Sequence, residues 1–255
     1  MAKDLDKKST AKSGARFHVA EKLGNGSELR LSTEAGHHAG RVLRLEAGDA
    51  VLLFDGRGGE FEARITRMER GDVWVKTGVH RDVDRESPLD VLLVQGLSGG
   101  DRMDFTLQKA VELGVGAIQP VATERSVVKL KDERAQRRAE HWRNLVVAAC
   151  EQCGRNRVPE VLPLRDFREW IADNAPEANC RLLLSPEAAD ALSSLSRPAG
   201  KVALLAGPEG GLTPAEAQIA VSRGFRPVRL GPRVLRTETA ALAALAAMQA
   251  RWGDF

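Results

Sequence analysis

The chain has 255 residues, of which 43% are hydrophobic and 29% are charged. This is the composition of an ordinary globular protein with one large domain or two small ones, and it excludes collagen-like, disordered and membrane-spanning classes. The formal net charge is only +3, so any basic surface that binds nucleic acid has to be local.

The first residues predict a tail rather than a folded element. Residues 1–15 are polar and lysine-rich, without the apolar segment of a secretory signal. The three cysteines of the chain are too few for a disulfide framework and are typical of a reducing compartment. We therefore expect a disordered basic tail on a cytoplasmic protein.

The next segment, residues 16–82, has the pattern of short strands and turns. Apolar and polar positions alternate in part, and Asp55-Gly56 and Gly71-Asp72 are placed as turn residues. This pattern predicts a small β-barrel. A charged stretch that ends at Pro88 suits a linker to a second domain.

From residue 88 to 255, apolar runs of strand length alternate with longer helical patterns. The expected strands are 89–96, 117–123, 181–185, 201–207 and 225–231. Such alternation predicts a parallel sheet covered by helices, an α/β fold.

Local signals predict where several helices begin and end. A helical stripe that starts at Met103 should stop at Gly114. Thr213 and Glu216 have the spacing of a capping box around a helix start. Thr237 is placed to cap the last helix, whose small and apolar residues over 240–250 predict that it is buried on every side.

Two glycine-containing turns follow expected strands and are the candidate ligand site. The first, residues 207–211, lies where open α/β sheets bind small ligands, although a plain tight turn would look the same. It has neither the lysine of a P-loop nor a dinucleotide fingerprint. Glu209 would repel a phosphate and tolerate a ligand with a positive centre. The second turn, residues 230–239, crowds charged side chains where a strand meets a helix, which favours function over a surface ion-pair cluster.

Two other features are less informative. Residues 123–157 carry nine basic residues against five acidic ones, which is compatible equally with a phosphate-binding surface and with a solvated helix face. The pair Cys150 and Cys153 lies on an apolar helical stripe with no second pair, so we expect core packing and no metal site.

Three long motifs in this order resemble those of the RsmE family, the 16S rRNA uridine-N3 methyltransferases of the SPOUT class. They are AACEQCGRNRVPEV at 148–161, GPEGGLTPAE at 207–216 and LGPRVLRTETAAL at 230–242. Shorter matches are found at 40–45, 52–56, 108–115 and 124–129. The resemblance covers the chain from about residue 16 to its end.

The resemblance implies a fold and a cofactor. It implies a PUA-like β-barrel that binds RNA at 16–82 and a SPOUT-type α/β methyltransferase domain with a trefoil knot at 88–255. It further implies a homodimer that binds S-adenosyl-L-methionine and acts on 16S rRNA in the small ribosomal subunit, with no membrane and no metal involved. The implied cofactor residues are Gly207, Glu209, Gly211, Leu230, Gly231, Leu235 and Thr237.

The same resemblance suggests roles for charged residues. Arg236 is the candidate hydrogen-bond donor to the uracil or stabiliser of its developing anion. Glu238 is a candidate proton acceptor only because it is near in sequence. The candidates for phosphate contacts are Arg16, Arg41, Arg44 and Arg125.

Other functions remain open at this point. One is a SPOUT methyltransferase with a different RNA target, because fold and cofactor do not dictate the base. Another is a ribosome-assembly or RNA-binding factor with a vestigial cofactor pocket. A nicotinamide dehydrogenase is a distant alternative, because its glycine fingerprint is missing.

Overall fold

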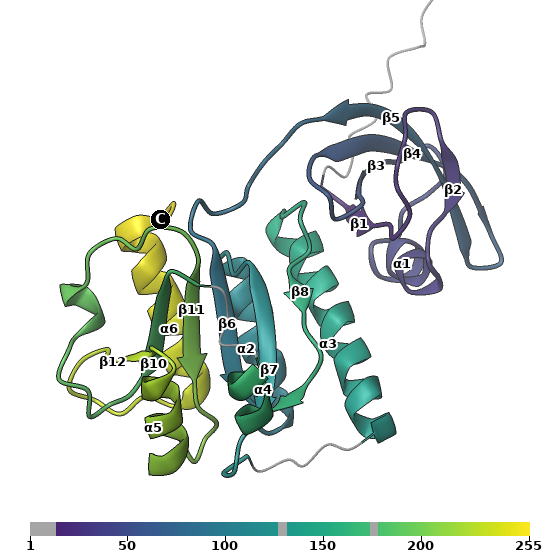
Figure 1. Ribbon diagram of the computed structural model, residues 1–255. Coiled ribbons are helices and arrows are strands. Elements are labelled where there is room, and N and C mark those ends of the chain that lie inside the picture. Colours follow the sequence, from purple (N-terminus) through teal and green to yellow (C-terminus); the bar gives the residue numbers. More distant parts are fainter. Residues whose placement is uncertain (1–13, 127–131, 174–177) are drawn as a thin grey trace, which may run out of the picture. The chain divides into compact units, whose positions relative to one another are not determined.

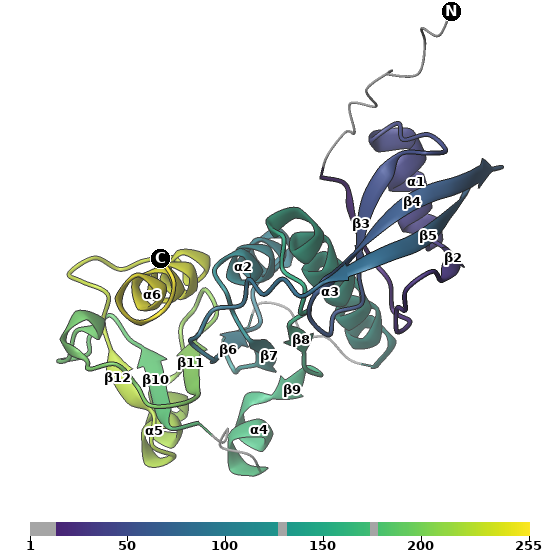
Figure 2. The ribbon, with the colours of Figure 1, turned by 90° about the horizontal axis from the view of Figure 1, so that it is seen from above.

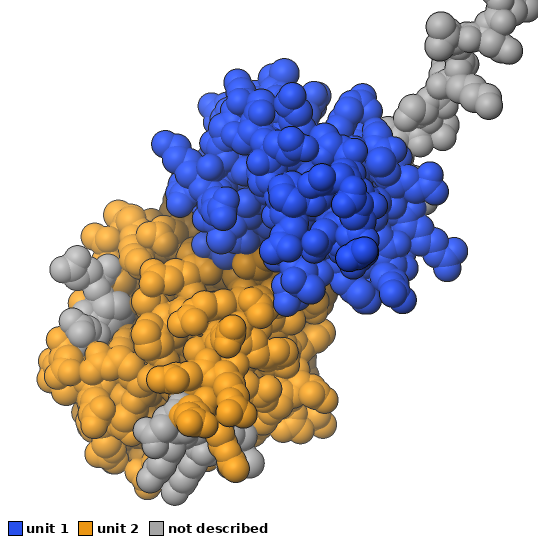
Figure 3. All heavy atoms as spheres, turned by 90° about the vertical axis from the view of Figure 1, so that its right-hand side faces the viewer, with its two compact units in different colours: residues 1–85, 151–158 blue, residues 86–150, 159–255 orange. Residues whose placement is uncertain are grey.

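The computed structural model describes residues 14–126, 132–173 and 178–255. The chain divides into two compact units, which Figure 3 colours separately. Unit 1 comprises residues 1–85 and 151–158, and unit 2 comprises residues 86–150 and 159–255. Residues 1–13 of the expected tail lie outside the described residues.

Unit 1 is built on a five-stranded sheet in the order β1-β3-β4-β5-β2 (Figure 1). The strands are β1 (Arg16–His18), β2 (Glu28–Arg30), β3 (Ala50–Phe54), β4 (Glu60–Glu69) and β5 (Asp72–Arg81). Alternate residues such as Val51, Leu53, Ala63, Ile65 and Val75 point into one apolar core. The structure confirms the predicted β-rich segment and adds β2, α1 (Thr33–His37) and a π-helical turn (His38–Val42), which the sequence pattern did not indicate.

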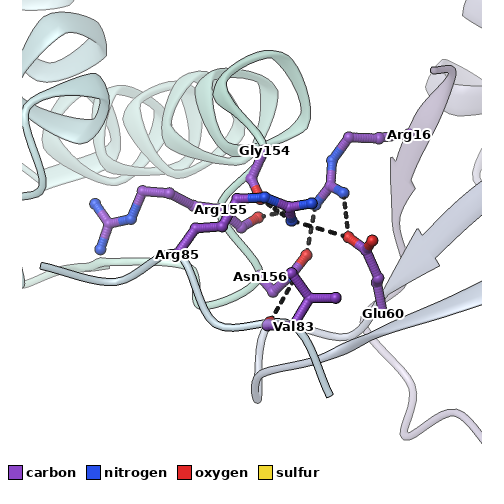
Figure 4. Close-up of polar contacts among 7 residues, drawn as sticks. All are labelled: Arg16, Glu60, Val83, Arg85, Gly154, Arg155 and Asn156. Atoms are coloured by element: carbon purple, nitrogen blue, oxygen red, sulfur yellow. Dashed lines mark hydrogen bonds and ion pairs between the residues drawn. The ribbon is translucent and has the colours of Figure 1, made fainter. Parts of the chain in front are cut away.

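A buried polar cluster in unit 1 attaches residues 151–158 to the strands (Figure 4). The Glu60 carboxylate accepts hydrogen bonds from Arg16 and from Arg85, the latter at 3.1 Å. Arg85 also donates to the Gly154 carbonyl at 3.0 Å, and Arg16 to the Asn156 side chain. Burial alone raises the pKa of Glu60, but its bonds to Arg85 and Arg16 outweigh that effect and hold the pKa below its usual value.

Unit 2 contains a seven-stranded sheet with the order β12-β10-β11-β6-β7-β8 and with β9 also paired to β7. All the pairs recorded in it are parallel, as the sequence predicted. The strands are β6 (Val91–Gly96), β7 (Ala117–Ala122), β8 (Glu160–Val161), β9 (Arg165–Asp166), β10 (Cys180–Leu184), β11 (Val202–Ala206) and β12 (Arg226–Val228). The very short β8 and β9 were not among the expected strands. The trefoil knot stays a prediction.

Helices cover both faces of this sheet (Figure 2). On one face lie α2 (Gly100–Glu112) and α6 (Thr237–Trp252), and on the other lie α4 (Phe167–Asp173) and α5 (Pro214–Ser222). The helix α3 (Asp132–Cys153) follows β7, and a short 3₁₀ turn spans Leu192–Ser194. Phe167, Trp170 and Ile171 of α4 pack with apolar strand residues into one core cluster.

The helices of unit 2 can be compared with the start, stop and burial signals that the sequence predicts for them. Gly114 follows α2 with φ +78°, as expected of a stop residue. Thr213 and Glu216 form the predicted capping box of α5. The expectation that α6 is buried is met only in part: one face, which includes Ala241, Leu245 and Met248, is fully buried, and the other is half-buried, with Ala250 exposed.

Candidate active site

A pocket of about 860 Å³ lies at the carboxyl ends of β10, β11 and β12 in unit 2. Its walls are the segments that follow these strands, at 183–187, 206–212, 228–231 and 233–238. Open parallel sheets bind ligands at this edge, because loops from neighbouring strands meet there. The pocket is where the two glycine-containing turns come together.

All the residues that the sequence suggested for the cofactor and the chemistry reach this pocket. Its lining includes Gly207, Glu209, Gly211, Leu230, Gly231, Leu235, Arg236, Thr237 and Glu238. One of the four suggested phosphate-contact residues, Arg125, lies there as well.

Glycine is required at specific points of the pocket wall. A Cβ on Gly96, at the end of β6, would lie 2.5 Å from the Pro208 nitrogen, so the strand end and the turn can meet only without a side chain. Gly211 has φ +66° and Gly231 has φ +132°, conformations that L-residues rarely adopt. Among the described residues, nothing lies within 4 Å of a Cβ at either position, so the space above both backbones is open to a ligand.

Thr237 joins the two turns instead of capping α6. Its Oγ1 donates to the Gly207 carbonyl at 2.6 Å and accepts from Gln95 Nε2 at 3.1 Å. Arg236 is the N-cap residue of α6. The predicted cap is therefore wrong, because the Thr237 hydroxyl is used in tertiary hydrogen bonds. Residues 207 and 237 are held together by this hydroxyl, which fixes the pocket floor.

Glu209 is held as a carboxylate at the pocket wall. Its Oε1 accepts from the Gly99 amide at 2.8 Å and from Arg102 Nη1 at 3.1 Å. Burial raises the pKa of Glu209, but backbone amides, including that of Gly99, and the Arg102 guanidinium together hold it below its usual value. Glu209 is thus charged at neutral pH and partly neutralised by Arg102.

Three buried acceptor atoms around the pocket lack hydrogen-bond partners among the described residues. They are Gln95 Oε1, Glu209 Oε2 and Glu238 Oε2. Buried polar atoms are nearly always satisfied, and each orphan costs free energy. A ligand that brings donors and positive charge would satisfy them, and phosphate groups would not. The amino group, the ribose hydroxyls and the sulfonium centre of S-adenosylmethionine fit these requirements.

Arginines surround the mouth of the pocket. Arg125, Arg233 and Arg236 are exposed, and Arg125 Nη1 donates to the Gly210 carbonyl at 3.1 Å. Arg229 donates to the Ala188 carbonyl at 2.7 Å and so braces the pocket wall. The pocket lining therefore combines acceptors that lack partners among the described residues with exposed cations.

The other suggested phosphate contacts lie in unit 1, and one of them is not supported. Arg41 and Arg44 are exposed. The Arg16 side chain is only 8% exposed and is bound to Glu60. A guanidinium that is buried against a carboxylate cannot bind a phosphate, so the structure does not support Arg16 as a phosphate contact. Lys129 and Lys131 of the basic stretch lie outside the described residues.

Among the residues that sequence reasoning missed, Gln95 and Arg102 contact the predicted site residues directly. Gln95 carried a signal, because a polar side chain at the end of an otherwise apolar strand has to find partners. Arg102 carried none, since nothing local indicates that it meets Glu209, which is far away along the chain.

The sequence predicts no metal site and no membrane-spanning segment, and the described residues bear on both predictions. Cys150 is buried and Cys153 half-buried in α3, and the described part of the chain has no group of three or more metal-ligating side chains. None of the helices within 14–126, 132–173 and 178–255 has the length and apolar character needed to cross a membrane.

Two family models match the chain. One, described as an RNA methyltransferase domain, matches residues 85–249, and another, described as an RNA methyltransferase PUA domain, matches residues 31–77. The chain is 31% identical to the ribosomal RNA small subunit methyltransferase E of Buchnera aphidicola subsp. Acyrthosiphon pisum, over 94% of each protein. It is 33% identical to the Bacillus subtilis protein of that name, over 86% of this chain and 88% of that protein.

Two solved structures are similar to this chain over most of its length. A ribosomal RNA small subunit methyltransferase E from Neisseria gonorrhoeae, described as bound to S-adenosyl methionine, is 46% identical with a TM-score of 0.87. A Legionella pneumophila protein, described as a methyltransferase in complex with the cofactor SAM, is 40% identical with a TM-score of 0.90. Each comparison covers 94% of this chain and 99% of the other. The fold, the pocket and these relatives together place the chain in the ribosomal RNA small subunit methyltransferase E family.

Proposed function

We propose that this protein transfers the methyl group of S-adenosylmethionine to N3 of a uridine in 16S rRNA of the small ribosomal subunit. The observation that carries the proposal is the pocket at the carboxyl ends of β10, β11 and β12. Its lining combines exposed arginines with Glu209 and Glu238, each of which has one oxygen without a partner among the described residues. Membership of a family of rRNA methyltransferases supports the reaction class.

The cofactor would supply a methyl group that is already activated by a sulfonium centre. In this chain, the backbones of Gly207, Gly211 and Gly231 would hold it, together with Leu230 and Leu235, and Thr237 would keep the turns in register. Glu209 Oε2 offers an acceptor of negative charge to a donor-rich, cationic ligand. No phosphate-binding lysine is needed, since this cofactor contains no phosphate.

The residues that act on the uridine would be Arg236 and Glu238. Uracil N3 carries a proton at neutral pH, so the site has to stabilise the anion that forms as the proton leaves. Arg236 is exposed at the pocket, where its guanidinium can donate to a uracil carbonyl. Glu238 lines the same pocket, and its Oε2 has no partner within the described ranges, which makes it our candidate to receive the proton.

The same proposal includes the RNA contacts, the oligomeric state and the location of the protein. Arg41, Arg44 and Arg125 would contact RNA phosphates, because they are exposed cations in the unit with the PUA match and at the pocket. The protein would act as a homodimer, and the half-exposed face of α6 and the 80% exposed Val234 are apolar surface that a second copy could cover. An rRNA substrate also implies a cytoplasmic protein.

The test is incubation of the purified protein with methyl-labelled S-adenosylmethionine and small ribosomal subunits that lack the modification. Digestion and nucleoside analysis should then find the label in 3-methyluridine from 16S rRNA. Label in another nucleoside would keep the reaction class and overturn the substrate. Cofactor binding without any transfer would instead favour the assembly-factor function.

A further inference from the structure

Two arginines from different elements hold consecutive residues of the glycine-rich turn. Arg102, in the first turn of α2, donates to Glu209 Oε1 at 3.1 Å. Arg125, in the loop after β7, donates to the Gly210 carbonyl at 3.1 Å. Both guanidinium groups are therefore anchored on consecutive residues of one segment of the pocket wall.

Both arginines keep N–H donors that these contacts do not use. A guanidinium has five N–H donors, and the contacts recorded among the described residues use one nitrogen of each arginine. The Arg102 side chain is 49% exposed, and Arg125 is exposed. Both groups are therefore oriented by the turn and still able to bind a second partner.

Partial neutralisation of Glu209 uses only some of the hydrogen-bonding capacity of Arg102. A pair that served the carboxylate would place two donors on its two oxygens, as bidentate pairs do. Here Arg102 shares Oε1 with the Gly99 amide, and Oε2 has no partner among the described residues. An ion pair this exposed also contributes little to stability. The contact therefore orients the arginine as well as the glutamate, and it leaves one carboxylate oxygen without a partner among the described residues.

We propose that Arg102 and Arg125 form a clamp that binds one phosphate of the RNA strand next to the target nucleotide. Arg102 is the new assignment, because the sequence analysis already suggests Arg125 as a phosphate contact. This inference rests on the proposed function, since it places an RNA substrate at the pocket. Two guanidinium groups held by the same turn supply the positive charge and the N–H donors that bind a phosphate. The acceptors inside the pocket repel that phosphate, so it stays at the rim while the cationic cofactor occupies the interior.

The clamp predicts a particular effect of Arg102→Gln in the full chain. Binding to small ribosomal subunits lacking the modification should weaken roughly tenfold, because one charge-assisted contact is lost. The slope of log affinity against log salt should fall by about one. In turnover, KM for the subunits should rise more than kcat falls. Arg102→Lys should recover most of the affinity, since the charge returns.

Two controls separate the clamp from a structural role. In Arg102→Gln, the affinity for S-adenosylmethionine, measured by calorimetry, should fall by a smaller factor than the affinity for the subunits. Arg226→Gln removes another exposed arginine of unit 2, which pairs with Asp190 and does not line the pocket. It should leave both the RNA affinity and the salt slope unchanged.

The outcomes also distinguish this inference from the function on which it rests. An unchanged RNA affinity and salt slope in Arg102→Gln, with normal methyl transfer by the wild-type protein, overturn the clamp alone. A loss of cofactor affinity with unchanged RNA affinity also overturns it, because Arg102 then serves only Glu209. Salt-dependent RNA binding that needs Arg102, without any methyl transfer by the wild-type protein, supports the clamp and overturns the proposed function.

Discussion

At the scale of single residues, the pocket depends on a few polar atoms with several partners. The hydroxyl of Thr237 bonds to the Gly207 carbonyl and to the Gln95 side chain, so one side chain connects both turns and the end of β6. Arg236, its neighbour in sequence, is exposed and remains available for a substrate. Thr237 therefore positions the two turns of the pocket, and its neighbour Arg236 is left to act on the substrate.

Thr237→Val tests the positioning role. The valine keeps the shape but removes both hydrogen bonds and leaves the Gly207 carbonyl without its hydroxyl partner. We expect affinity for S-adenosylmethionine to fall about tenfold, since a lost buried hydrogen bond costs roughly 1 to 3 kcal/mol. Thr237→Ser retains the hydroxyl and should bind nearly as well as wild type in the same calorimetric titration. Equal binding by the serine and valine variants would contradict this role.

Arg236→Ala tests the chemical role. Loss of a donor to a developing anion typically lowers kcat by about 100- to 1,000-fold. Because Arg236 is exposed, the thermal midpoint and the cofactor affinity should change little. Single-turnover rates with saturating cofactor would measure the effect. A wild-type rate in this variant would remove Arg236 from the chemistry.

At the scale of elements, the sequence predicts best what neighbouring residues decide. The capping box of α5 was predictable because Thr213 and Glu216 lie three positions apart, and the structure contains both of its hydrogen bonds. The cap of α6 was predicted wrongly because the Thr237 hydroxyl has tertiary partners. The short β8 and β9 have too few residues to show a pattern, and the half-exposed face of α6 cannot be told from composition alone.

The capping box gives a prediction about stability. Thr213→Ala should lower the free energy of unfolding by about 1 kcal/mol, the usual value of an N-cap. Glu216→Ala should cost more, because the 1% exposed Glu216 also accepts from the Glu124 amide at 2.8 Å. Urea unfolding followed by circular dichroism would measure both. A larger loss in Thr213→Ala than in Glu216→Ala would show that the tie to the β7 end carries no stability.

At the scale of the whole molecule, the chain order and the compact units do not coincide. Residues 151–158 follow α3 in sequence but pack with the strands of unit 1, where Asn156 donates to the Val83 carbonyl at 3.0 Å. The parallel sheet and the β-rich unit were predictable from periodicity, and the pocket residues from the resemblance. The return of 151–158 and the burial of Arg16 depend on contacts between distant residues, which no local pattern encodes.

The Glu60 cluster makes the stability of unit 1 depend on pH. The pKa of Glu60 is lowered from 4.5 in the folded protein, so its contribution is present above about pH 4.5 and is lost as pH falls through the folded value. At pH 7, Glu60→Gln should cost about 3 kcal/mol, because Arg16 loses its buried partner. The difference from wild type should shrink in urea titrations below pH 4.5. A difference that stays constant down to pH 3 would contradict the ion-pair account.

The pocket at the ends of β10, β11 and β12 should be where the protein binds S-adenosylmethionine. Ultraviolet crosslinking of labelled S-adenosylmethionine to the full chain, followed by tryptic peptide mapping, would locate the bound cofactor. We predict label in the peptides from the pocket walls, within 202–223 or 230–236, and its loss when excess S-adenosylhomocysteine competes. Competable label confined to peptides of unit 1 would contradict the claim.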